Sequence, residues 1–254
     1  HRDLPELAEM AGNREFELRE WAIRNIATKA AAIVVDSEVT KAKLKTNYGI
    51  VDSKIHSLPF APRSVGMPLK GDRESFALYP AHYWSHKNHI VLFKAIAQLL
   101  SEDKTPRQLK LTGQDRGNLK YLIEKTNELG ISRYVEFLGF IPLTDLHALY
   151  KQAAVVMMPS LLGPTNLPPL ESLLNGCSVA VTPSARANLG DWKGVIELDG
   201  NDISAWSHLL DQSTKFPQVD IPIIQSHLSK VESSNLAKLQ ALFMNFKLMR
   251  GMYQ

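Results

Sequence analysis

The feature that most constrains the fold of this chain is a regular alternation of short apolar runs with longer amphipathic segments. From residue 31 onward, most apolar runs are followed by a segment of about ten to fifteen residues in which apolar side chains recur at helical spacing. Strands that alternate with helices of this length predict βαβ units and a mainly parallel sheet with right-handed crossovers. We therefore expect an α/β fold with a Rossmann-like parallel sheet and helices on both of its faces.

The same pattern locates the individual elements. The expected strands are residues 31–35, 54–60, 75–80, 107–113, 134–140, 154–160, 177–183 and 194–200. The expected helices are residues 38–49, 89–103, 117–130, 142–153, 202–212 and 235–249. Between the second and third strands, the proline-rich stretch 59–72 has the composition of a linker.

Charge and cysteine content exclude several classes of function. The formal net charge of +3 over 254 residues is too small to indicate a nucleic-acid partner. Basic residues recur in two segments, which we interpret as solvated helix faces, with contact to an anionic membrane surface as the alternative: Arg14, Arg19, Arg24, Lys29, Lys41, Lys43 and Lys45. The single cysteine, Cys177, excludes an intrachain disulfide framework and a Cys-rich zinc site.

The sequence also bears on location in the cell. No apolar run approaches the roughly 20 residues of a membrane-spanning helix, and no signal peptide is recognisable. With the single cysteine, these features favour the cytoplasm, and a peripheral position at the inner face of the membrane is the alternative. Because the sequence begins His-Arg-Asp without an initiator methionine, a fragment or a processed chain is one interpretation.

Four loops are expected at the edge of the sheet where a ligand would bind. Ligands of open parallel sheets bind outside the carboxyl ends of the strands. The loops that follow strands there are residues 80–89, 113–117, 139–142 and 159–167, and they are rich in Gly, Pro, His and Asn. We expect these loops to line one cleft.

The stretch "GPTNLPPLESLLNGC", residues 163–177, predicts a helix with a well-defined start and end. Asn166 is a candidate N-cap, two prolines suit the first helical turn, and Gly176 is a candidate C-terminal stop. The start of such a helix presents free N–H groups and a positive dipole end, which suit a phosphate. A purely structural capped helix is an equally good interpretation of this stretch alone.

The stretch "YPAHYWSHKNH" carries the second group of candidate residues. Lys87, next to a helix start, is placed to hold phosphate oxygens. His82, His86 and His89 raise the question of a metal, but no carboxylate or cysteine lies among them, so hydrogen bonding or capping is the favoured interpretation. We expect Trp84 to lie in the core.

Other enzyme signatures are missing from the sequence. The glycine turn "LTGQDRGN" lacks both the G-x-G-x-x-G dinucleotide fingerprint and the P-loop pattern, which argues against a nicotinamide enzyme or an ATPase. No G-x-S-x-G elbow is present, so a serine hydrolase has no support.

Four segments together resemble a known family. "VVDSEVTKAKL", "YPAHYWSHKNH", "FLGFIPLTDLHALYKQAAVVMMPS" and "GPTNLPPLESLLNGCSVAVT" occur in this order. From about residue 31 to residue 213, the chain is similar to the C-terminal, donor-binding half of a retaining GT-B glycosyltransferase of the family 4 type, also called glycosyl transferases group 1. Within that family, the "HKNH" loop is similar to that of transferases that build O-antigen and other surface polysaccharides.

The resemblance implies roles for individual residues. The family's basic pair binds the donor diphosphate and stabilises the leaving group; Lys87 matches its lysine, and His82 stands where an arginine is usual. Glu171 matches the glutamate that binds the ribose hydroxyls, whereas Gly163 stands where the family has a second glutamate near the reacting carbon. The remaining donor contacts would come from the backbone, at Pro164, Thr165, Asn166 and Leu167 and, for the nucleobase, at Gly139, Phe140 and Ile141.

The resemblance also implies a function. The protein would transfer a hexose from a nucleotide sugar to a surface-polysaccharide or lipid-linked glycan acceptor with retention, without a metal or cofactor. GDP-mannose is the first candidate donor, with UDP- and dTDP-linked sugars next. The alternative is an isolated nucleotide-sugar-binding domain without activity of its own, which needs a partner with an acceptor domain; an epimerase or phosphatase lacks its motifs.

The implied domain organisation has three parts. Residues 1–59 would be a remnant of the N-terminal acceptor lobe with its linker, residues 60–232 the nucleotide-sugar-binding domain, and residues 233–254 a C-terminal helix.

Overall fold

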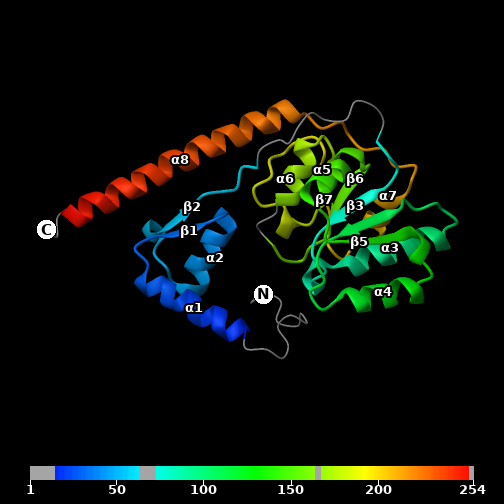
Figure 1. Ribbon diagram of the computed structural model, residues 1–254, viewed down its shortest axis with the longest axis horizontal. Helices are drawn as coiled ribbons and strands as arrows, with labels where there is room; N and C mark the ends of the chain where they lie inside the picture. The colour runs from blue at the N-terminus through cyan, green and yellow to red at the C-terminus, as the bar shows by residue number, and fades with distance from the viewer. Residues whose placement is uncertain (1–14, 63–72, 164–166, 252–254) are drawn as a thin grey trace.

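The computed structural model describes residues 15–62, 73–163 and 167–251. These residues form a large α/β unit, a small α/β unit and a long C-terminal helix that runs along both (Figure 1). No helix of the described part of the chain is both long and apolar enough to cross a membrane.

The large unit is built on a six-stranded parallel sheet with the order β5-β4-β3-β6-β7-β8. Its strands are β3 (Ala77–Pro80), β4 (Leu109–Thr112), β5 (Val135–Gly139), β6 (Val155–Met158), β7 (Ser178–Val181) and β8 (Val195–Glu197). The chain runs outward from β3 to β5, returns to place β6 beside β3, and then runs outward to β8. This is the Rossmann strand order, and its reversal between β3 and β6 leaves a crevice at the carboxyl ends of these two strands. The expected fold class is therefore confirmed.

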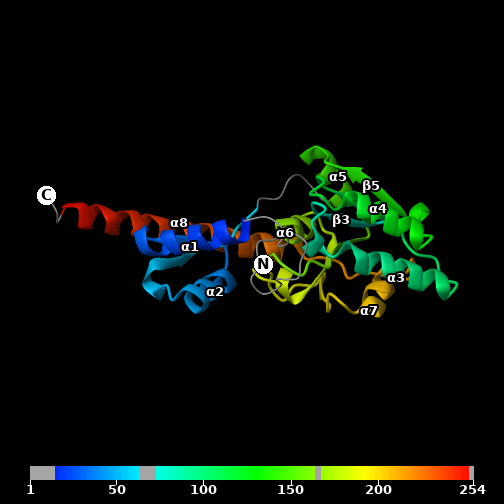
Figure 2. The same cartoon turned by 90° about the horizontal axis from the view of Figure 1, so that it is seen from below.

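Helices cover both faces of this sheet (Figures 1 and 2). They are α3 (His89–Ser101), α4 (Leu119–Glu128), α5 (Leu143–Gln152), α6 (Leu167–Leu174) and α7 (Ile203–Leu210), with short 3-10 turns η3 (Ser85–Lys87), η4 (Ser132–Tyr134) and η5 (Pro183–Ala185). Helix α3 packs against α4 and α7, whereas α5 packs against α6. These two groups form the two helical layers that a doubly wound sheet requires.

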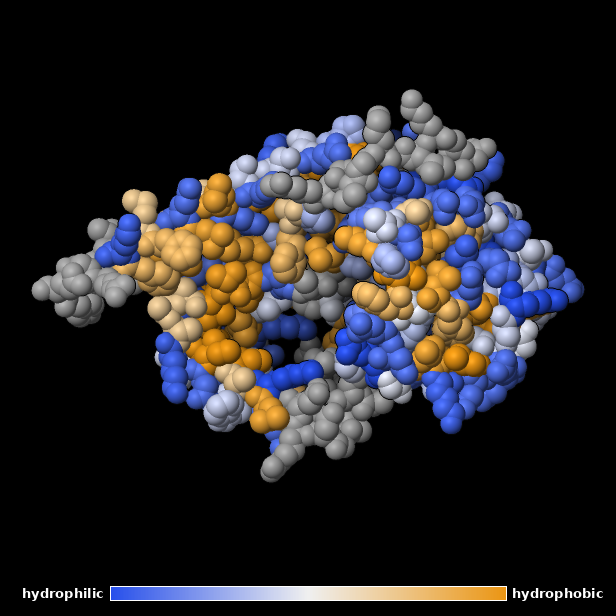
Figure 3. All heavy atoms as spheres, viewed as in Figure 1, coloured by the Kyte–Doolittle hydropathy of each residue, from blue (hydrophilic) through white to orange (hydrophobic). Residues whose placement is uncertain are grey.

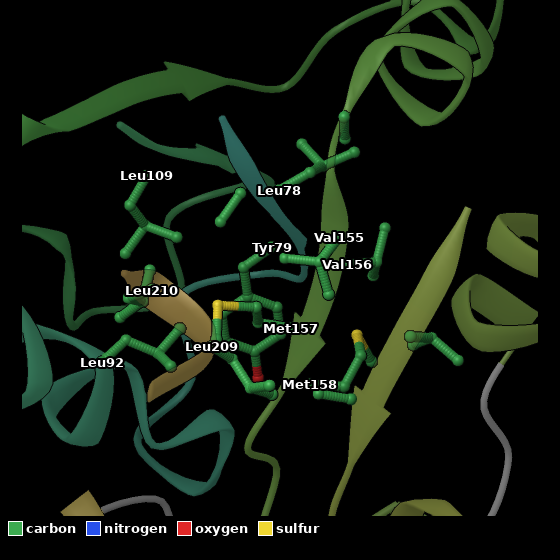
Figure 4. Packing of buried hydrophobic residues seen from close by; sticks show 14 of the residues in the cluster. Leu78, Tyr79, Leu92, Leu109, Val155, Val156, Met157, Met158, Leu209 and Leu210 are labelled. Carbon is green, nitrogen blue, oxygen red and sulfur yellow. The ribbon is translucent and has the colours of Figure 1, made fainter. Parts of the chain in front are cut away.

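The core of the large unit lies around the central strands (Figure 4). All four residues of β3, β6 and β7 are buried, which is the pattern expected of parallel strands that are covered on both faces. Trp206 of α7 is fully buried in the same cluster, and its indole N–H donates to the carbonyl of Asp199 at 2.8 Å. The packed sheet is thus a rigid support for the loops at its carboxyl edge.

The small unit comprises α1 (Glu15–Lys29), β1 (Ile33–Val35), α2 (Glu38–Tyr48), η2 (Asp52–Lys54) and β2 (Ile55–Ser57). Strands β1 and β2 pair in parallel and form a sheet of two strands. Ser37 caps α2 by accepting from the amide of Thr40 at 3.1 Å, and Gly49 ends the helix in the left-handed region at a φ of 65°. The predicted strand–helix–strand order of this segment is confirmed.

Helix α8 (Ile221–Gly251) connects the two units (Figure 1). Its first part packs against α6, and Leu228 is buried in the large core. Farther along, the side chains of Asn235 and Lys238 donate to the carbonyls of Pro59 and Ser57 at 2.7 and 3.3 Å. The helix begins well before the expected residue 235, so the expected domain limit at residue 233 falls inside a continuous helix.

The small unit and the end of α8 expose many apolar side chains (Figure 3). We call this the apolar surface; its members are Leu18, Trp21, Ile26, Val34, Leu236, Phe243 and Met244, each at least half exposed. On α1, Leu18 and Trp21 lie one turn apart on the exposed side, whereas Ala27 packs against the core of the small unit. Exposed apolar patches of this kind mark interaction sites.

Candidate functional site

A cavity of about 270 Å³ opens at the carboxyl edge of the large sheet. It lies at the strand-order reversal between β3 and β6, where ligands of this fold bind. Its lining residues come from the ends of β3, β4 and β6, from the loops after β3, β4 and β5, and from α5 and α6: Pro80, Ala81, His82, Lys87, Thr112, Gly113, Phe140, Ile141, Leu146, Met158 and Pro168. The predicted residues His82, Lys87, Phe140 and Ile141 are therefore brought together.

A larger cavity, of about 830 Å³, lies at the opposite, amino edge of the sheet. It is lined by Arg73 and Arg107, whose guanidinium groups are engaged by backbone carbonyls. Since these arginines tie strand starts and loops together, we interpret this cavity as structural and the smaller one as the candidate site.

The loop that carries Lys87 is held in place by its backbone. Tyr79, buried in β3, donates its hydroxyl to the carbonyl of Lys87 at 2.6 Å. Asn88 follows in the left-handed conformation, with a φ of 54°, and its side-chain amide donates to the carbonyl of Gly200 at 2.8 Å. These contacts fix the backbone of Lys87, which lines the cavity.

The loops after β3 and β4 pack directly on each other. Gly113 has a φ of 150°, and a Cβ built there would lie 2.3 Å from the carbonyl oxygen of Ala81. Beside it, His82 accepts the amide N–H of Gln114 on Nδ1 at 2.9 Å. Burial, followed by the positive charges of Arg116 and Lys87, lowers the pKa of His82 below its ordinary value. The imidazole is therefore neutral near pH 7.

Trp84 does not lie in the core, which corrects the expectation from the sequence. Its ring stacks on His86 with centroids 6.2 Å apart, and the guanidinium of Arg116 lies 5.7 Å from the same ring. Its neighbour Tyr83 is fully buried instead. Successive side chains of an extended segment point to opposite sides, so only one of the two can enter the core.

The three histidines of this loop point in different directions. His82 lines the cavity, and His86 stacks on Trp84. His89 is buried beside Tyr79, with ring centroids 4.7 Å apart, and burial lowers the pKa of His89 to about 3. Among the described residues, no three His, Cys, Asp or Glu side chains gather where they could hold a metal ion.

Helix α6 brings its first turn to the cavity through Pro168. It ends in a Schellman motif, in which the amides of Gly176 and Cys177 donate to the carbonyls of Leu173 and Ser172, and Gly176 has a φ of 73°. The predicted C-terminal stop is confirmed. Residues Pro164, Thr165 and Asn166, including the predicted N-cap, lie outside the described residues.

Glu171 lies on α6, and a tyrosine of the neighbouring helix α5 holds its carboxylate in place. Its Oε2 accepts the hydroxyl of Tyr150 at 3.0 Å. Tyr150 is fully buried, and burial together with the Glu171 charge raises the pKa of this tyrosine well above its ordinary value. Tyr150 was not expected from the sequence, because a tyrosine at a core position of a helix carries no signal of a polar partner.

Not every predicted residue lines the cavity in the described structure. Glu171, Gly139, Gly163 and Leu167 are not among its lining residues. Gly139 and Gly163 have positive φ values of 66° and 128°, as expected for glycines at sharp turns after strands. Thr112 and Leu146, by contrast, line the cavity without having been predicted, since neither residue type indicates a ligand by itself.

Comparison with known proteins identifies the family. The model of the family "Glycosyl transferases group 1" matches residues 67–209, which is more than half of the chain. The chain belongs to the group 1 glycosyltransferases. The matched residues span β3 to α7 and include every residue that lines the cavity.

Curated relatives of this group 1 glycosyltransferase have moderate identity. The D-inositol 3-phosphate glycosyltransferase of Corynebacterium urealyticum is 29% identical over 224 residues, 79% of this chain and 52% of the relative. An uncharacterized glycosyltransferase of Methanocaldococcus jannaschii is 30% identical over 141 residues, 56% of this chain and 33% of the relative. The chain spans about half the length of the first of these relatives.

Solved structures share the fold at lower identity. Sucrose-phosphate synthase from Thermosynechococcus elongatus superposes with a TM-score of 0.71 at 18% identity, covering 95% of this chain and 65% of that one. HepE of Anabaena, in complex with UDP and glucose, gives a TM-score of 0.63 at 15% identity, covering 88% and 66%. Both matches cover the small unit as well as the large one, because each exceeds the length of the large unit alone.

Proposed function

We propose that the cavity between β3 and β6 binds a nucleotide sugar and that the chain provides the donor side of a retaining hexosyl transfer. The observation that carries this proposal is the meeting of Lys87, His82 and the first turn of α6 in one cavity at the strand-order reversal. A lysine, a ring N–H and a helix N-terminus form an environment suited to a diphosphate.

Catalysis would depend on stabilising the leaving group. As the bond between the anomeric carbon and the diphosphate oxygen breaks, the electron pair stays on the nucleoside diphosphate. The ammonium of Lys87 and the hydrogen bond from His82 would stabilise this growing negative charge. Glu171 would hold the ribose hydroxyls, and the backbone from Gly139 to Ile141 would contact the base.

The donor is proposed at the level of a nucleoside diphosphate hexose. GDP-mannose remains the first candidate, with UDP- and dTDP-linked sugars next. The complex of HepE with UDP and glucose supports a donor of this chemical class. We propose a surface-polysaccharide or lipid-linked glycan as the acceptor, with the reaction taking place in the cytoplasm or at the inner face of the membrane.

The second candidate function is a donor-binding module that needs another lobe for transfer. Two observations favour it: among the described residues the sheet of the small unit has two strands, and much of the apolar surface lies on this unit. Parallel sheets are normally covered on both faces, so a second α/β lobe is the partner that suits the small unit.

Calorimetry with GDP, UDP and dTDP tests the donor site. At least one nucleotide should bind, and Lys87→Ala should weaken its binding about 10- to 100-fold, the range for a hydrogen bond to a charged group. Lys94→Ala, on the exposed face of α3, is the matched control and should bind like wild type. Equal affinities of wild type and Lys87→Ala would refute the assignment.

A further inference from the structure

One ring nitrogen of His82 has a fixed hydrogen-bond partner, and the side chain lines the cavity. Nδ1 accepts the backbone amide of Gln114 at 2.9 Å. A backbone amide only donates, so Nδ1 must carry a lone pair and no proton. In a neutral imidazole the single proton then lies on Nε2, which makes Nε2 a hydrogen-bond donor.

The packing of the loops after β3 and β4 opposes a flip of the His82 ring, which would move Nδ1 away from the Gln114 amide. The amide of Tyr83 donates to the carbonyl of Gln114 at 3.0 Å, which continues the β3–β4 pairing past the strand ends. Gly113 allows the two loops to touch, because any side chain there would meet Ala81. A flipped ring would present N–H or C–H to the Gln114 amide and leave that amide without its acceptor.

The charged groups that face His82 come from two elements. Lys87 lies in η3, and Arg116 lies in the loop that follows β4; both positive charges oppose a second proton on the ring. The nearby carboxylate of Asp115 is engaged elsewhere, since its Oδ1 accepts the amides of Gly117, Asn118 and Leu119 at the start of α4. The surroundings of the ring therefore favour the neutral form.

We infer that His82 contacts the donor diphosphate as a neutral Nε2–H donor, oriented by the Gln114 amide, while Lys87 supplies the positive charge. This inference rests on the proposed function, because it names how one residue of that site acts. The resemblance assigns an arginine to this position, so a second fixed cation would be usual. In this chain, a directional hydrogen bond replaces that charge, and donor affinity does not depend on protonation of His82.

The first test is NMR of the ring nitrogens, on the ¹⁵N-labelled chain with and without the nucleoside diphosphate that binds best. The expected spectra show Nδ1 unprotonated and Nε2 protonated in both states near pH 7. Protonation of both nitrogens in the complex would overturn the inference.

The second test compares affinities from pH 6.5 to 8.5. His82→Gln keeps a neutral N–H donor at the place of Nε2, so it should bind within about threefold of wild type, whereas His82→Ala should bind about tenfold or more weakly, as for a lost hydrogen bond to a charged group. The ratio of wild-type to His82→Gln affinity cancels the ionisation of the ligand and should stay constant with pH. A ratio that falls as pH rises would show a cationic His82.

Controls separate the possible failures. His208→Gln, on the exposed face of α7, should match wild type, and thermal unfolding checks that each variant is folded. If Lys87→Ala weakens binding but His82→Ala does not, the inference is wrong and the proposed function stands. If no nucleoside diphosphate binds the wild type, both are wrong.

Discussion

Replacing Gly113 by alanine tests whether the close contact between the loops after β3 and β4 builds the site. The added Cβ would lie 2.3 Å from the Ala81 oxygen and 2.7 Å from Cα of His82, distances that force these loops apart. The backbone φ of 150° lies in a region that is almost restricted to glycine and adds about 1–3 kcal/mol of strain. Overpacking adds a similar amount. We expect the free energy of unfolding of the large unit to fall by about 2–6 kcal/mol.

Gly130→Ala provides the matched control. Gly130 has a φ of 66°, and nothing lies within 4 Å of a Cβ built there. An alanine at this position would therefore meet no clash, and its only cost would be the strain of the left-handed conformation, about 1–2 kcal/mol. Urea unfolding followed by tryptophan fluorescence, to which the buried Trp206 contributes, measures stability, and calorimetry with the bound nucleotide measures the site. Gly113→Ala should lose both stability and affinity, whereas Gly130→Ala should lose some stability only. Equal losses for the two variants would show that the contact with Ala81 contributes nothing, and the reasoning would be refuted.

Three further predictions follow from the structure. Glu171→Gln and Tyr150→Phe should each weaken nucleotide binding in calorimetry, since one removes the carboxylate proposed for the ribose and the other the hydroxyl that orients it; normal affinity with lost turnover would instead place Glu171 at the chemical step. Because the pKa of His89 is about 3 in the folded protein, the unfolded chain binds an extra proton below pH 6.5, so stability should fall by up to about 1.4 kcal/mol per pH unit from pH 6.5 towards 3. His89→Gln should flatten this part of the urea-midpoint profile, and an unchanged slope would contradict the assignment. Finally, the 254-residue chain alone should turn over a nucleotide sugar far more slowly than about 1 per second, and an ordinary rate with an oligosaccharide acceptor would show that no second lobe is needed.

Much of the large unit could be predicted from the sequence because its elements repeat on a regular period. The strands around Leu78, Val156 and Ala180 are short, apolar and bounded by turn residues, and each was expected close to where it lies. Gly176 was recognisable as a helix end because only a glycine adopts its left-handed conformation without strain. The start of α8 was missed, although Ile221, Ile224, Leu228 and Val231 recur at helical spacing from its first residue.

The candidate site was predicted less completely than the fold. Lys87 and His82 follow a strand, and polar residues after strand ends lie at one edge of a parallel sheet, so their meeting in one cavity could be predicted; their roles at the donor stay predictions. The orientation of Trp84 depends on which of two neighbouring aromatic residues fits the core, and this is decided by tertiary packing. The bonds from Tyr150 to Glu171 and from Gln114 to His82 join segments that are distant in sequence, so no local pattern indicates them.

The course of α8 limits how the two units can rotate relative to each other. Leu228 is buried in the core of the large unit, and Asn235 and Lys238 donate to the carbonyls of Pro59 and Ser57 at the end of the small unit, so a change in the angle between the units would bend α8 or break one of these attachments. Within this segment the hydroxyl of Ser233 donates to the carbonyl of Ser229 at 2.9 Å, a side-chain bond that favours bending of a helix. A bend at this bond would leave the contacts of Leu228 and Asn235 intact.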